Sequence, residues 1–419
     1  MKVMSVVGAR PNFMKVAPII SAIRQYNSRK PVDPHGTGSA GECPRLEHVL
    51  VHTGQHYDQE MSGSFFRDLN LPDPDVYLGV GSGSHSVQTA EIMKRFEEVL
   101  VRERPDILLV VGDVNSTLAC SLVAAKISFD PAGTRPLIAH VEAGLRSFDR
   151  TMPEEVNRVV TDHISDLLFV TEESGLRNLS QEGIAAEKVH FVGNTMIDSV
   201  LAYKQDAESS TVLDRLGLRD ALPRNGTGKD VARYALLTIH RPSNVDTRAP
   251  FLNILEGLQE LSGRMPIVFP AHPRTRKRID EFGLGNYFAS TALGQAATGI
   301  RLLEPQGYLD FLCLMKHAAL VVTDSGGIQE ETTCLGVPCV TVRENTERPV
   351  TLTMGTNVLA GVTKESICTA VRRQLKGKRA KSIPELWDGR AAERIAEIIS
   401  SALVVRQREL NSEPVSRFK

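Results

Sequence analysis

The 419-residue sequence predicts an α/β protein built from two doubly wound, Rossmann-like domains that face a cleft. Two features predict this fold class. Short apolar runs alternate with helix-forming segments along the chain, which is typical of β-α-β units and a mostly parallel sheet. Glycines and charged residues follow several of these runs, and such sheets bind ligands at the carboxyl ends of their strands. The chain is also long enough for about two to three domains with their own cores.

The expected strands form two series with a connecting segment between them. The first series is predicted at residues 3–7, 47–52, 107–111, 137–141, 167–170 and 189–192, and the second at residues 235–239, 267–269, 300–303, 320–322 and 337–342. Charges, a proline and an Asn-Gly-Thr-Gly run favour a connection over residues 203–229. We therefore predict an N-terminal domain at 1–203, a C-terminal domain at 204–388, and a helical segment at 389–419 that can cross back to the first domain. Surface insertions are expected at 28–42, 226–230 and 283–298.

The composition argues against several classes of protein. The 49 basic and 50 acidic residues nearly cancel, so the net charge indicates neither a nucleic-acid partner nor a membrane surface. The six cysteines form no Cys-x-x-Cys pair and no cluster with zinc spacing, so we expect free thiols and no metal site. No apolar run approaches the ~18 residues of a membrane helix, and the N-terminal run is too short for a signal peptide. A soluble, cytoplasmic protein is expected.

Residues 323–331 combine a strand end, a turn of small residues and the start of a helix. Ser325 is expected to cap this helix, while Gly326 and Gly327 let a ligand approach the first free backbone N–H groups, which bind anions such as phosphate. Glu331 is expected near the end of the first helical turn, where its carboxylate would accept hydrogen bonds from a diol such as ribose. Taken alone, the glycine turn is explained equally well by an ordinary Ser-capped helix.

Three carboxylates stand at expected strand ends or just beyond them, namely Asp113, Glu142 and Glu154. Each of them taken singly is also explained as a helix cap, and acidic residues are favoured directly after a proline that starts a helix, as at Glu154. Arg158 follows Glu154 by four residues and is expected on the same helical face. This spacing predicts either a solvated salt bridge or a pair that tunes a catalytic carboxylate.

Basic residues gather at corresponding places in the two halves. Arg10 and Lys15 lie on the first strand-to-helix loop, and Arg348 follows the run at 337–342. His240 ends a strand and begins a loop near the expected crevice, so we interpret it as a residue that faces a ligand and not as a core residue.

Taken together and in order, these motifs resemble those of the non-hydrolysing UDP-N-acetylglucosamine 2-epimerases, over nearly the whole chain. The matching motifs are GARPNFMK at 8–15, TGQH at 53–56, GD at 112–113, HVEAGLR at 140–146, PEEVNR at 153–158, GNT at 193–195, HR at 240–241, DSGGIQEE at 324–331 and TERP at 346–349. The resemblance implies a glycosyltransferase-B-like fold, a homodimer, a UDP-sugar substrate, and neither a metal nor another cofactor.

The resemblance also implies roles for the candidate residues. It places Arg10, His240, Ser325, Gly326 and Gly327 at the diphosphate, Glu331 at the ribose, Gln306 and Phe311 beside the uracil, and Lys15 and Arg348 in the substrate pocket. It assigns Asp113, Glu142 and Glu154 to proton transfer. We hypothesise that Asp113 and Glu142 act near C2 of the sugar while Glu154 and Arg158 position and tune the site.

The implied reaction removes the weakly acidic C2 proton while UDP leaves C1, which forms 2-acetamidoglucal, and then reverses these steps on the opposite face of C2. It needs at least one base and one acid. Other functions stay open. A UDP-2,3-diacetamido uronic acid 2-epimerase would use an extra cation near the sugar, for which Arg241, Arg274 and Arg343 are unassigned. A UDP-sugar-dependent glycosyltransferase, a hydrolysing epimerase and a ligand sensor are further alternatives, and the set of three carboxylates argues against the transferase and the sensor.

Overall fold

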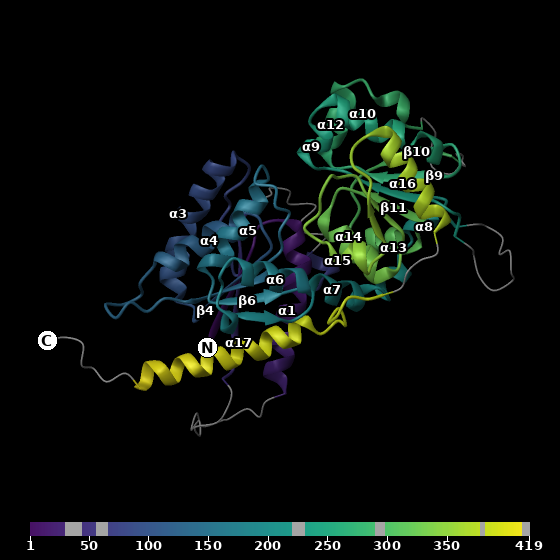
Figure 1. Ribbon diagram of the computed structural model, residues 1–419. Helices are drawn as coiled ribbons and strands as arrows, with labels where there is room; N and C mark the ends of the chain where they lie inside the picture. Colours follow the sequence, from purple (N-terminus) through teal and green to yellow (C-terminus); the bar gives the residue numbers. More distant parts are fainter. Residues whose placement is uncertain (30–43, 56–65, 220–230, 290–297, 378–381, 413–419) are drawn as a thin grey trace. The chain divides into compact units, whose positions relative to one another are not determined.

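The computed structural model describes residues 1–29, 44–55, 66–219, 231–289, 298–377 and 382–412 (Figure 1). The expected insertion at 226–230, most of the one at 28–42, and His56 of the TGQH motif lie outside these residues. Of the expected insertion at 283–298, residues 283–289 are described, and they include the fully buried Leu284, so this part is not purely a surface loop. The chain divides into two compact units, one made of Met1–Ser199 with Glu385–Lys419 and the other of Val200–Pro384. Both boundaries fall slightly earlier in the sequence than those expected at 203 and 388.

The first unit contains a parallel sheet whose strands run in the order β3-β2-β1-β4-β5-β6-β7. The strands are β1 (Lys2–Val7), β2 (Glu47–His52), β3 (Val76–Tyr77), β4 (Ile107–Val111), β5 (Leu137–Ala143), β6 (Leu167–Val170) and β7 (Val189–Phe191). Strand order reverses between β1 and β4, which is the topological switch point of a doubly wound sheet. Ligands of such sheets bind outside the carboxyl ends of the strands at this point.

Helices cover this sheet because its central strands are apolar on both faces. The helices of this unit are α1 (Arg10–Ser28), α3 (His85–Glu103), α4 (Asn115–Lys126), α5 (Pro153–Ile164), α6 (Glu173–Gln181) and α17 (Ala391–Ser412). Helix α7 (Thr195–Tyr203) begins in this unit and continues past its boundary at Ser199. Met4 of β1 and Leu108 of β4 are fully buried in one cluster with Ile92 and Phe96 of α3. The next residue along each strand is also buried, so the continuous apolar runs reflect a sheet covered on both sides.

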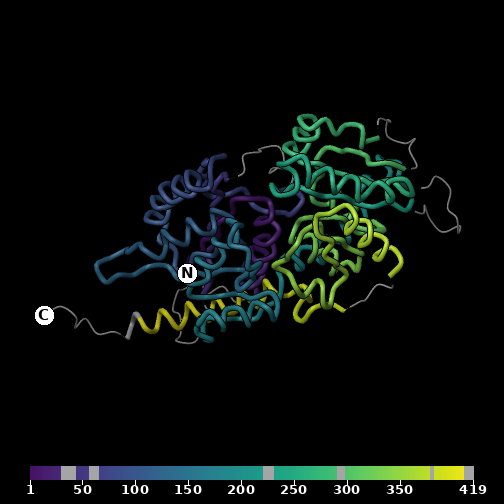
Figure 2. The backbone as a smooth tube through the Cα atoms, turned by 45° about the horizontal axis from the view of Figure 1, so that its top comes forward, coloured from purple at the N-terminus to yellow at the C-terminus, as the bar shows by residue number. Residues whose placement is uncertain are grey.

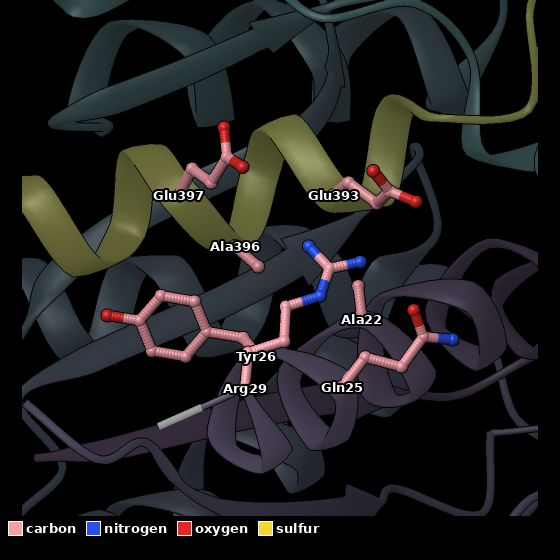
Figure 3. A pocket seen from close by; sticks show the side chains of 7 residues that line it. All are labelled: Ala22, Gln25, Tyr26, Arg29, Glu393, Ala396 and Glu397. Atoms are coloured by element: carbon pink, nitrogen blue, oxygen red, sulfur yellow. The ribbon is translucent and has the colours of Figure 1, made fainter. Parts of the chain in front are cut away.

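The C-terminal helix α17 belongs to the first unit and packs against α1. Figure 2 shows α17, in yellow, alongside the purple and teal elements of this unit. Figure 3 shows a small pocket where Ala22 and Tyr26 of α1 face Ala396 and Glu393 of α17. Asp198 of α7 accepts hydrogen bonds from the backbone N–H groups of Ala391 and Ala392 at 3.2 and 2.7 Å, so it ties down the start of α17.

The second unit repeats the architecture, with a parallel sheet in the order β10-β9-β8-β11-β12-β13. Its strands are β8 (Ala235–Thr238), β9 (Pro266–Pro270), β10 (Gly299–Leu303), β11 (Leu320–Thr323), β12 (Cys339–Thr341) and β13 (Asn357–Leu359). Its helices are α8 (Val212–Arg215), α9 (Pro242–Val245), α10 (Arg248–Gly257), α11 (Gln259–Ser262), α12 (Pro273–Glu281), α13 (Tyr308–His317), α14 (Gly326–Leu335), α15 (Val350–Thr353) and α16 (Lys364–Lys376). The switch point lies between β8 and β11.

The predicted fold class, with two Rossmann-like domains, is confirmed. Every predicted apolar run forms a strand, whereas two short edge strands, β3 and β13, were not predicted. Val76–Tyr77 and Asn357–Leu359 are too short to show a strand pattern, and they form strands only by pairing with the neighbouring strands β2 and β12. Within the described ranges, no helix is both long enough and apolar enough to cross a membrane.

Candidate active site

The first strand-to-helix loop of the first unit is held tightly to β4. Asn12 accepts hydrogen bonds from the backbone N–H groups of Gly8 and Ala9, both at 3.0 Å, and donates one to the carbonyl of Val111 at 3.1 Å. A Cβ on Gly8 would lie only 2.2 Å from the Oγ of Ser116, so the loop requires glycine there. This packing places Arg10, half-buried at the start of α1, beside the switch point.

Lys15 of α1 and Glu142 of β5 form a buried ion pair at the same sheet edge. Lys15 Nζ contacts Glu142 Oε2, and the two side chains are 7% and 4% exposed. Gly112 lies against the pair, since a Cβ on Gly112 would approach Lys15 Nζ to 2.9 Å and Glu142 Oε2 to 3.2 Å. Two sequence-predicted residues from distant parts of the chain are thus brought together at the ends of β4 and β5.

Glu142 has an unusual backbone conformation. Its φ is +78°, and the pairing of β5 with β6 shifts register between Val141 and Ala143. A non-glycine residue in the left-handed region costs about 1–3 kcal/mol and persists where the surrounding structure holds it, often at functional sites. Bulges beside active sites commonly re-orient a side chain, so this bulge indicates that the orientation of the Glu142 side chain is functional.

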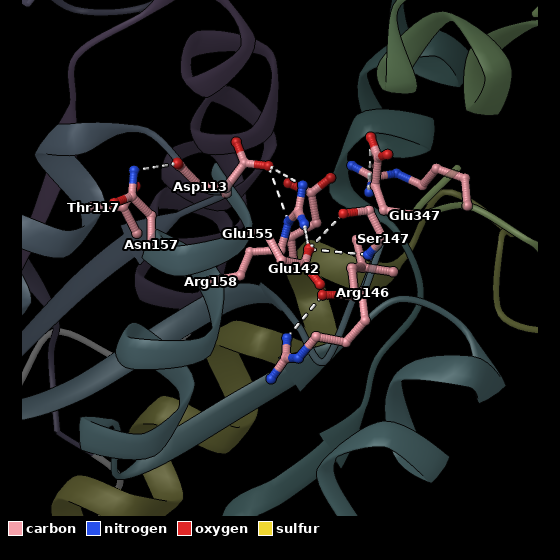
Figure 4. Close-up of polar contacts among 12 residues, drawn as sticks. Asp113, Thr117, Glu142, Arg146, Ser147, Glu155, Asn157, Arg158 and Glu347 are labelled. Atoms are coloured by element: carbon pink, nitrogen blue, oxygen red, sulfur yellow. Dashed lines mark hydrogen bonds and ion pairs between the residues drawn. The ribbon is translucent and has the colours of Figure 1, made fainter. Parts of the chain in front are cut away.

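Asp113 and Arg158 form a second charged cluster beside this pair (Figure 4). Arg158 of α5 donates to Asp113 Oδ2 from Nη2 at 2.8 Å and from Nε at 3.1 Å, and its Nη1 contacts Glu155. The Arg158 side chain is 2% exposed, whereas Asp113 is one-quarter exposed. The predicted pairing of Arg158 with Glu154 is wrong, because the fork of the guanidinium reaches Glu155 and Asp113 while Glu154 stays half-exposed in the first turn of α5.

Glu155 is a buried residue whose role the sequence did not predict. Its carboxylate accepts hydrogen bonds from the backbone N–H and the hydroxyl of Ser147, both at 3.0 Å, and from the N–H of Phe148 at 2.8 Å. Glu155 therefore holds both the loop after β5 and the guanidinium of Arg158. Its place as the third residue of α5 was a usable signal, since carboxylates there often bond to backbone N–H groups that precede the helix.

In the second unit, Asp324 organises the carboxyl ends of β8 and β11. Its buried carboxylate accepts hydrogen bonds from the N–H of His240 at 3.1 Å, the N–H of Arg241 at 2.9 Å and the side chain of Asn244 at 3.1 Å. Burial opposes its ionisation, but His240 and these bonds prevail and lower the pKa of Asp324. The His240 ring is exposed, with Nδ1 3.3 Å from Asp324. Asp324 was not among the residues predicted from the sequence, although a carboxylate directly after an apolar strand was a signal.

The turn before α14 departs from the prediction in one respect. Ser325 occupies the N-cap position, but its side chain makes no capping hydrogen bond, so the expected Ser325 cap is wrong. Its backbone N–H instead donates to the Oγ1 of Thr323 at 3.0 Å. The first-turn N–H groups of α14 therefore have no side-chain cap from Ser325. A Cβ on Gly326 would lie 2.4 Å from Glu347 Oε1, which requires glycine at the start of this helix.

Glu331 is the sixth residue of α14, in the second turn and not in the first as expected. It is buried, and its Oε1 has no hydrogen-bond partner among the described residues. Burial, and then the neighbouring Glu330, raise the pKa of Glu331 to about 8. A buried acceptor without a donor is uncommon in native proteins and often marks the place of a ligand or a water.

The remaining predicted residues lie on elements around α14. Arg348 is buried, with Nε 2.7 Å from Glu330. Gln306 lies between β10 and α13 and donates to the carbonyl of Glu304 at 2.7 Å, and Phe311 is half-buried in the first turn of α13. The carboxylate of Glu331 contributes, after burial, to the raised pKa of Tyr308, the first residue of α13, so these elements adjoin.

The three unassigned arginines all contact carboxylates within the second unit. Arg343 lies 2.7 Å from Glu347, Arg241 lies 3.5 Å from the same carboxylate, and Arg274 pairs with Asp246. Over the part of the chain that the structure describes, no group of three or more His, Cys, Asp or Glu residues is placed to hold a metal ion.

Comparisons with known proteins identify the family and the fold that this chain resembles. The family model for UDP-N-acetylglucosamine 2-epimerase matches residues 40–400. The UDP-N-acetylglucosamine 2-epimerase of Methanocaldococcus jannaschii is 42% identical over 96% of this chain and 99% of its own length. A crystal structure of that enzyme with UDP-GlcNAc and UDP has a TM-score of 0.81 at 41% identity, over 96% of this chain and all of the other. A UDP-2,3-diacetamido-2,3-dideoxy-D-glucuronate 2-epimerase of Pseudomonas aeruginosa is 36% identical over 96% of this chain and 99% of its own length. The chain therefore belongs to the UDP-N-acetylglucosamine 2-epimerase family.

Proposed function

We propose that the protein interconverts UDP-N-acetylglucosamine and UDP-N-acetylmannosamine by a cofactor-independent, non-hydrolysing epimerisation at C2. One observation carries this proposal beyond family membership. Asp113 and Glu142 follow or end the adjacent strands β4 and β5, and each contacts a buried cation, Arg158 for Asp113 and Lys15 for Glu142. Two carboxylates at one sheet edge supply the acid and the base that a proton exchange at C2 requires.

In the first half of the reaction, one carboxylate removes the C2 proton. The electrons of the C–H bond form the C1–C2 double bond, and the C1–O bond breaks with its electron pair leaving on UDP. In the second half, the UDP oxygen attacks C1, and the double-bond electrons take a proton at C2 from the opposite face. Asp113 and Glu142 fill these two roles in the proposal, and Glu154, in the first turn of α5, is proposed to help position the site.

The second unit is proposed to hold the nucleotide. The N-terminus of α14, at Ser325, Gly326 and Gly327, would bind the diphosphate together with His240. Such donors stabilise the charge that grows on UDP as it leaves. The unsatisfied Oε1 of Glu331 supports a ribose contact, because ribose hydroxyls would supply the missing donors. Gln306 and Phe311 are proposed at the uracil, and Arg348 as a further substrate contact.

The similarity to the Pseudomonas aeruginosa enzyme supports a second candidate substrate, a UDP-diacetamido uronic acid. Recognition of the extra sugar carboxylate would need an available cation. Arg241, Arg274 and Arg343 already contact carboxylates of the second unit, so we place UDP-N-acetylglucosamine first. The family resemblance also supports a cytoplasmic location and a homodimer. Light scattering during size-exclusion chromatography would test the homodimer.

The decisive experiment incubates the purified protein with UDP-N-acetylglucosamine in D2O and follows the products by proton NMR. We expect UDP-N-acetylmannosamine to appear, with deuterium at C2 of both sugars. Free N-acetylmannosamine together with UDP would indicate a hydrolysing enzyme. No turnover would contradict the proposal. The protein would then be tested with the UDP-diacetamido uronic acid, and with UDP-N-acetylglucosamine plus an acceptor sugar. Turnover only in the first case would indicate the uronic acid epimerase, and turnover only in the second would indicate a glycosyltransferase.

Binding of UDP-N-acetylglucosamine is expected to release a proton from Glu331. The pKa of Glu331 in the free protein is about 8, so the group is mainly protonated at pH 7. Ribose hydroxyls donate to the carboxylate, which favours its charged form and lowers its pKa in the complex. Affinity should therefore rise with pH toward a plateau above 8, and at pH 7 it should be about tenfold below that plateau.

Titration calorimetry in two buffers of different ionisation enthalpy measures this proton release. UDP-N-acetylglucosamine is the ligand of choice, because its diphosphate lacks the terminal phosphate ionisation near pH 6. Glu331→Gln is the matched control and should bind more weakly, with no proton release and little pH dependence. Equal heats in the two buffers for the wild-type protein would show that binding releases no proton from Glu331, which would contradict this prediction.

A further inference from the structure

A buried histidine on β5 connects the two proposed catalytic loops. His140 is fully buried, with Nε2 2.8 Å from the carbonyl oxygen of Gly112 and Nδ1 2.6 Å from Oδ1 of Asp162. A carbonyl oxygen only accepts hydrogen bonds, so Nε2 carries a proton and donates it to Gly112. The Gly112 carbonyl belongs to the peptide bond that leads directly into Asp113.

Asp162 extends this connection to the loop after Glu142. Its second oxygen, Oδ2, accepts from the backbone N–H of Gly144 at 3.0 Å and lies 2.8 Å from Nη1 of Arg146. Burial alone would favour the neutral acid, but His140 and Arg146 outweigh it and lower the pKa of Asp162. The carboxylate therefore acts as an acceptor for the ring of His140 and for the Gly144 peptide at once.

The peptides that this pair holds have conformations that need support. Gly112, Glu142 and Gly144 all have positive φ, at +67°, +78° and +79°. Glu142 is the costly one of the three, because it carries a side chain. Helix α5 contacts both loops. Its Arg158 binds the Asp113 carboxylate. Its Asp162, one turn further along, is linked through His140 to the peptide that precedes Asp113 and binds the Gly144 N–H directly.

We propose that the His140–Asp162 pair is a positioning device for the epimerisation, which sets Asp113 through the Gly112 carbonyl and Glu142 through the Gly144 amide. The proposal rests on the proposed function of Asp113 and Glu142. It assigns no proton transfer to His140, which is buried behind the loops and already bonded at both nitrogens.

Two substitutions of His140 separate the bond to Gly112 from the rest of the network. The amide nitrogen of asparagine takes the place of Nδ1, so His140→Asn keeps a donor for Asp162 and loses the bond to Gly112. The amide nitrogen of glutamine takes the place of Nε2, so His140→Gln keeps the bond to Gly112. We expect kcat to fall about 100-fold in His140→Asn, since small displacements of reacting groups cost that much. His140→Gln should lower kcat by no more than about threefold, which is far less than the 100-fold loss expected for His140→Asn.

UDP affinity and KM should change little in both variants, because the nucleotide contacts lie elsewhere. Asp162→Asn, which preserves the shape of the side chain, should reproduce the selective fall in kcat. It provides the test if His140→Asn does not fold. Glu182→Gln is the control, because Glu182 binds Arg146 at 2.7 Å from outside the network and touches neither Gly112 nor Gly144. It should leave kcat unchanged.

The readouts are kcat, KM, deuterium exchange at C2, UDP affinity and melting temperature. Equal losses of kcat in His140→Asn and His140→Gln, or losses that follow the melting temperature, would reduce the pair to a structural role. Full kcat in His140→Asn, with C2 exchange by the wild-type protein, would overturn this inference alone. Absence of C2 exchange in the wild-type protein would overturn the proposed function, and this inference with it.

Discussion

Glu142→Gln is expected to lower kcat for UDP-N-acetylglucosamine by about 10³-fold and to abolish measurable deuterium exchange at C2. The amide cannot take or return a proton, and a positioned acid or base contributes roughly 10² to 10⁴ to an enzymatic rate. Asp113→Asn should show a loss of the same order. The measurement is initial velocity at saturating substrate, together with NMR of the C2 proton in D2O. Near wild-type exchange in both variants would rule out their assignment to C2.

Stability must be separated from chemistry in this test, because Glu142 is the ion-pair partner of buried Lys15. Breaking one member of a buried pair leaves an uncompensated charge and typically costs about 3–5 kcal/mol. The double variant Lys15→Met with Glu142→Gln removes both charges and should recover much of the unfolding free energy. Its kcat should stay at the low level of Glu142→Gln. Recovery of activity in the double variant would show that Glu142 serves only to balance Lys15.

Arg158→Met is expected to destabilise the first unit by about 3–5 kcal/mol and to inactivate the protein. The substitution leaves Glu155 buried without its cation, while Asp113, which is more exposed, recovers part of its solvation. Arg158→Lys should give a smaller loss of stability but a clear loss of kcat, because an ammonium group cannot reproduce the fork that bridges two carboxylates.

Urea unfolding of the isolated variants measures these changes, and Arg158→Met combined with Glu155→Gln is the informative comparison. Removal of the buried negative charge should restore part of the lost stability without restoring kcat, because Asp113 still lacks its partner. An Arg158→Met protein as stable and as active as the wild type would show that neither carboxylate depends on this guanidinium.

The elements were predictable to the extent that local pattern determines them. Strands such as β4 and β11 are buried on both faces, so their apolar character is continuous and visible in the sequence. The same reasoning selected the candidate residues that follow them, including Asp113 and Gly326. It failed for Ser325, whose spacing fits a cap although its side chain makes no capping bond, and for Glu331, which lies one turn further into α14 than expected.

By itself, the sequence determined which segments form strands, which residues follow them, and the family to which the motifs belong. The tertiary structure decided which charges meet. Lys15 and Glu142 are 127 residues apart, and Asp113 and Arg158 are 45 apart, so no local periodicity records these pairs. Helical spacing favoured Glu154 as the partner of Arg158, but the packing of α5 against α4 and β5 brought Asp113 to the guanidinium, which also contacts Glu155. The strand order, the bulge at Glu142 and the unsatisfied carboxylate of Glu331 likewise arise only when distant segments pack together, because they depend on contacts and burial that the chain acquires on folding.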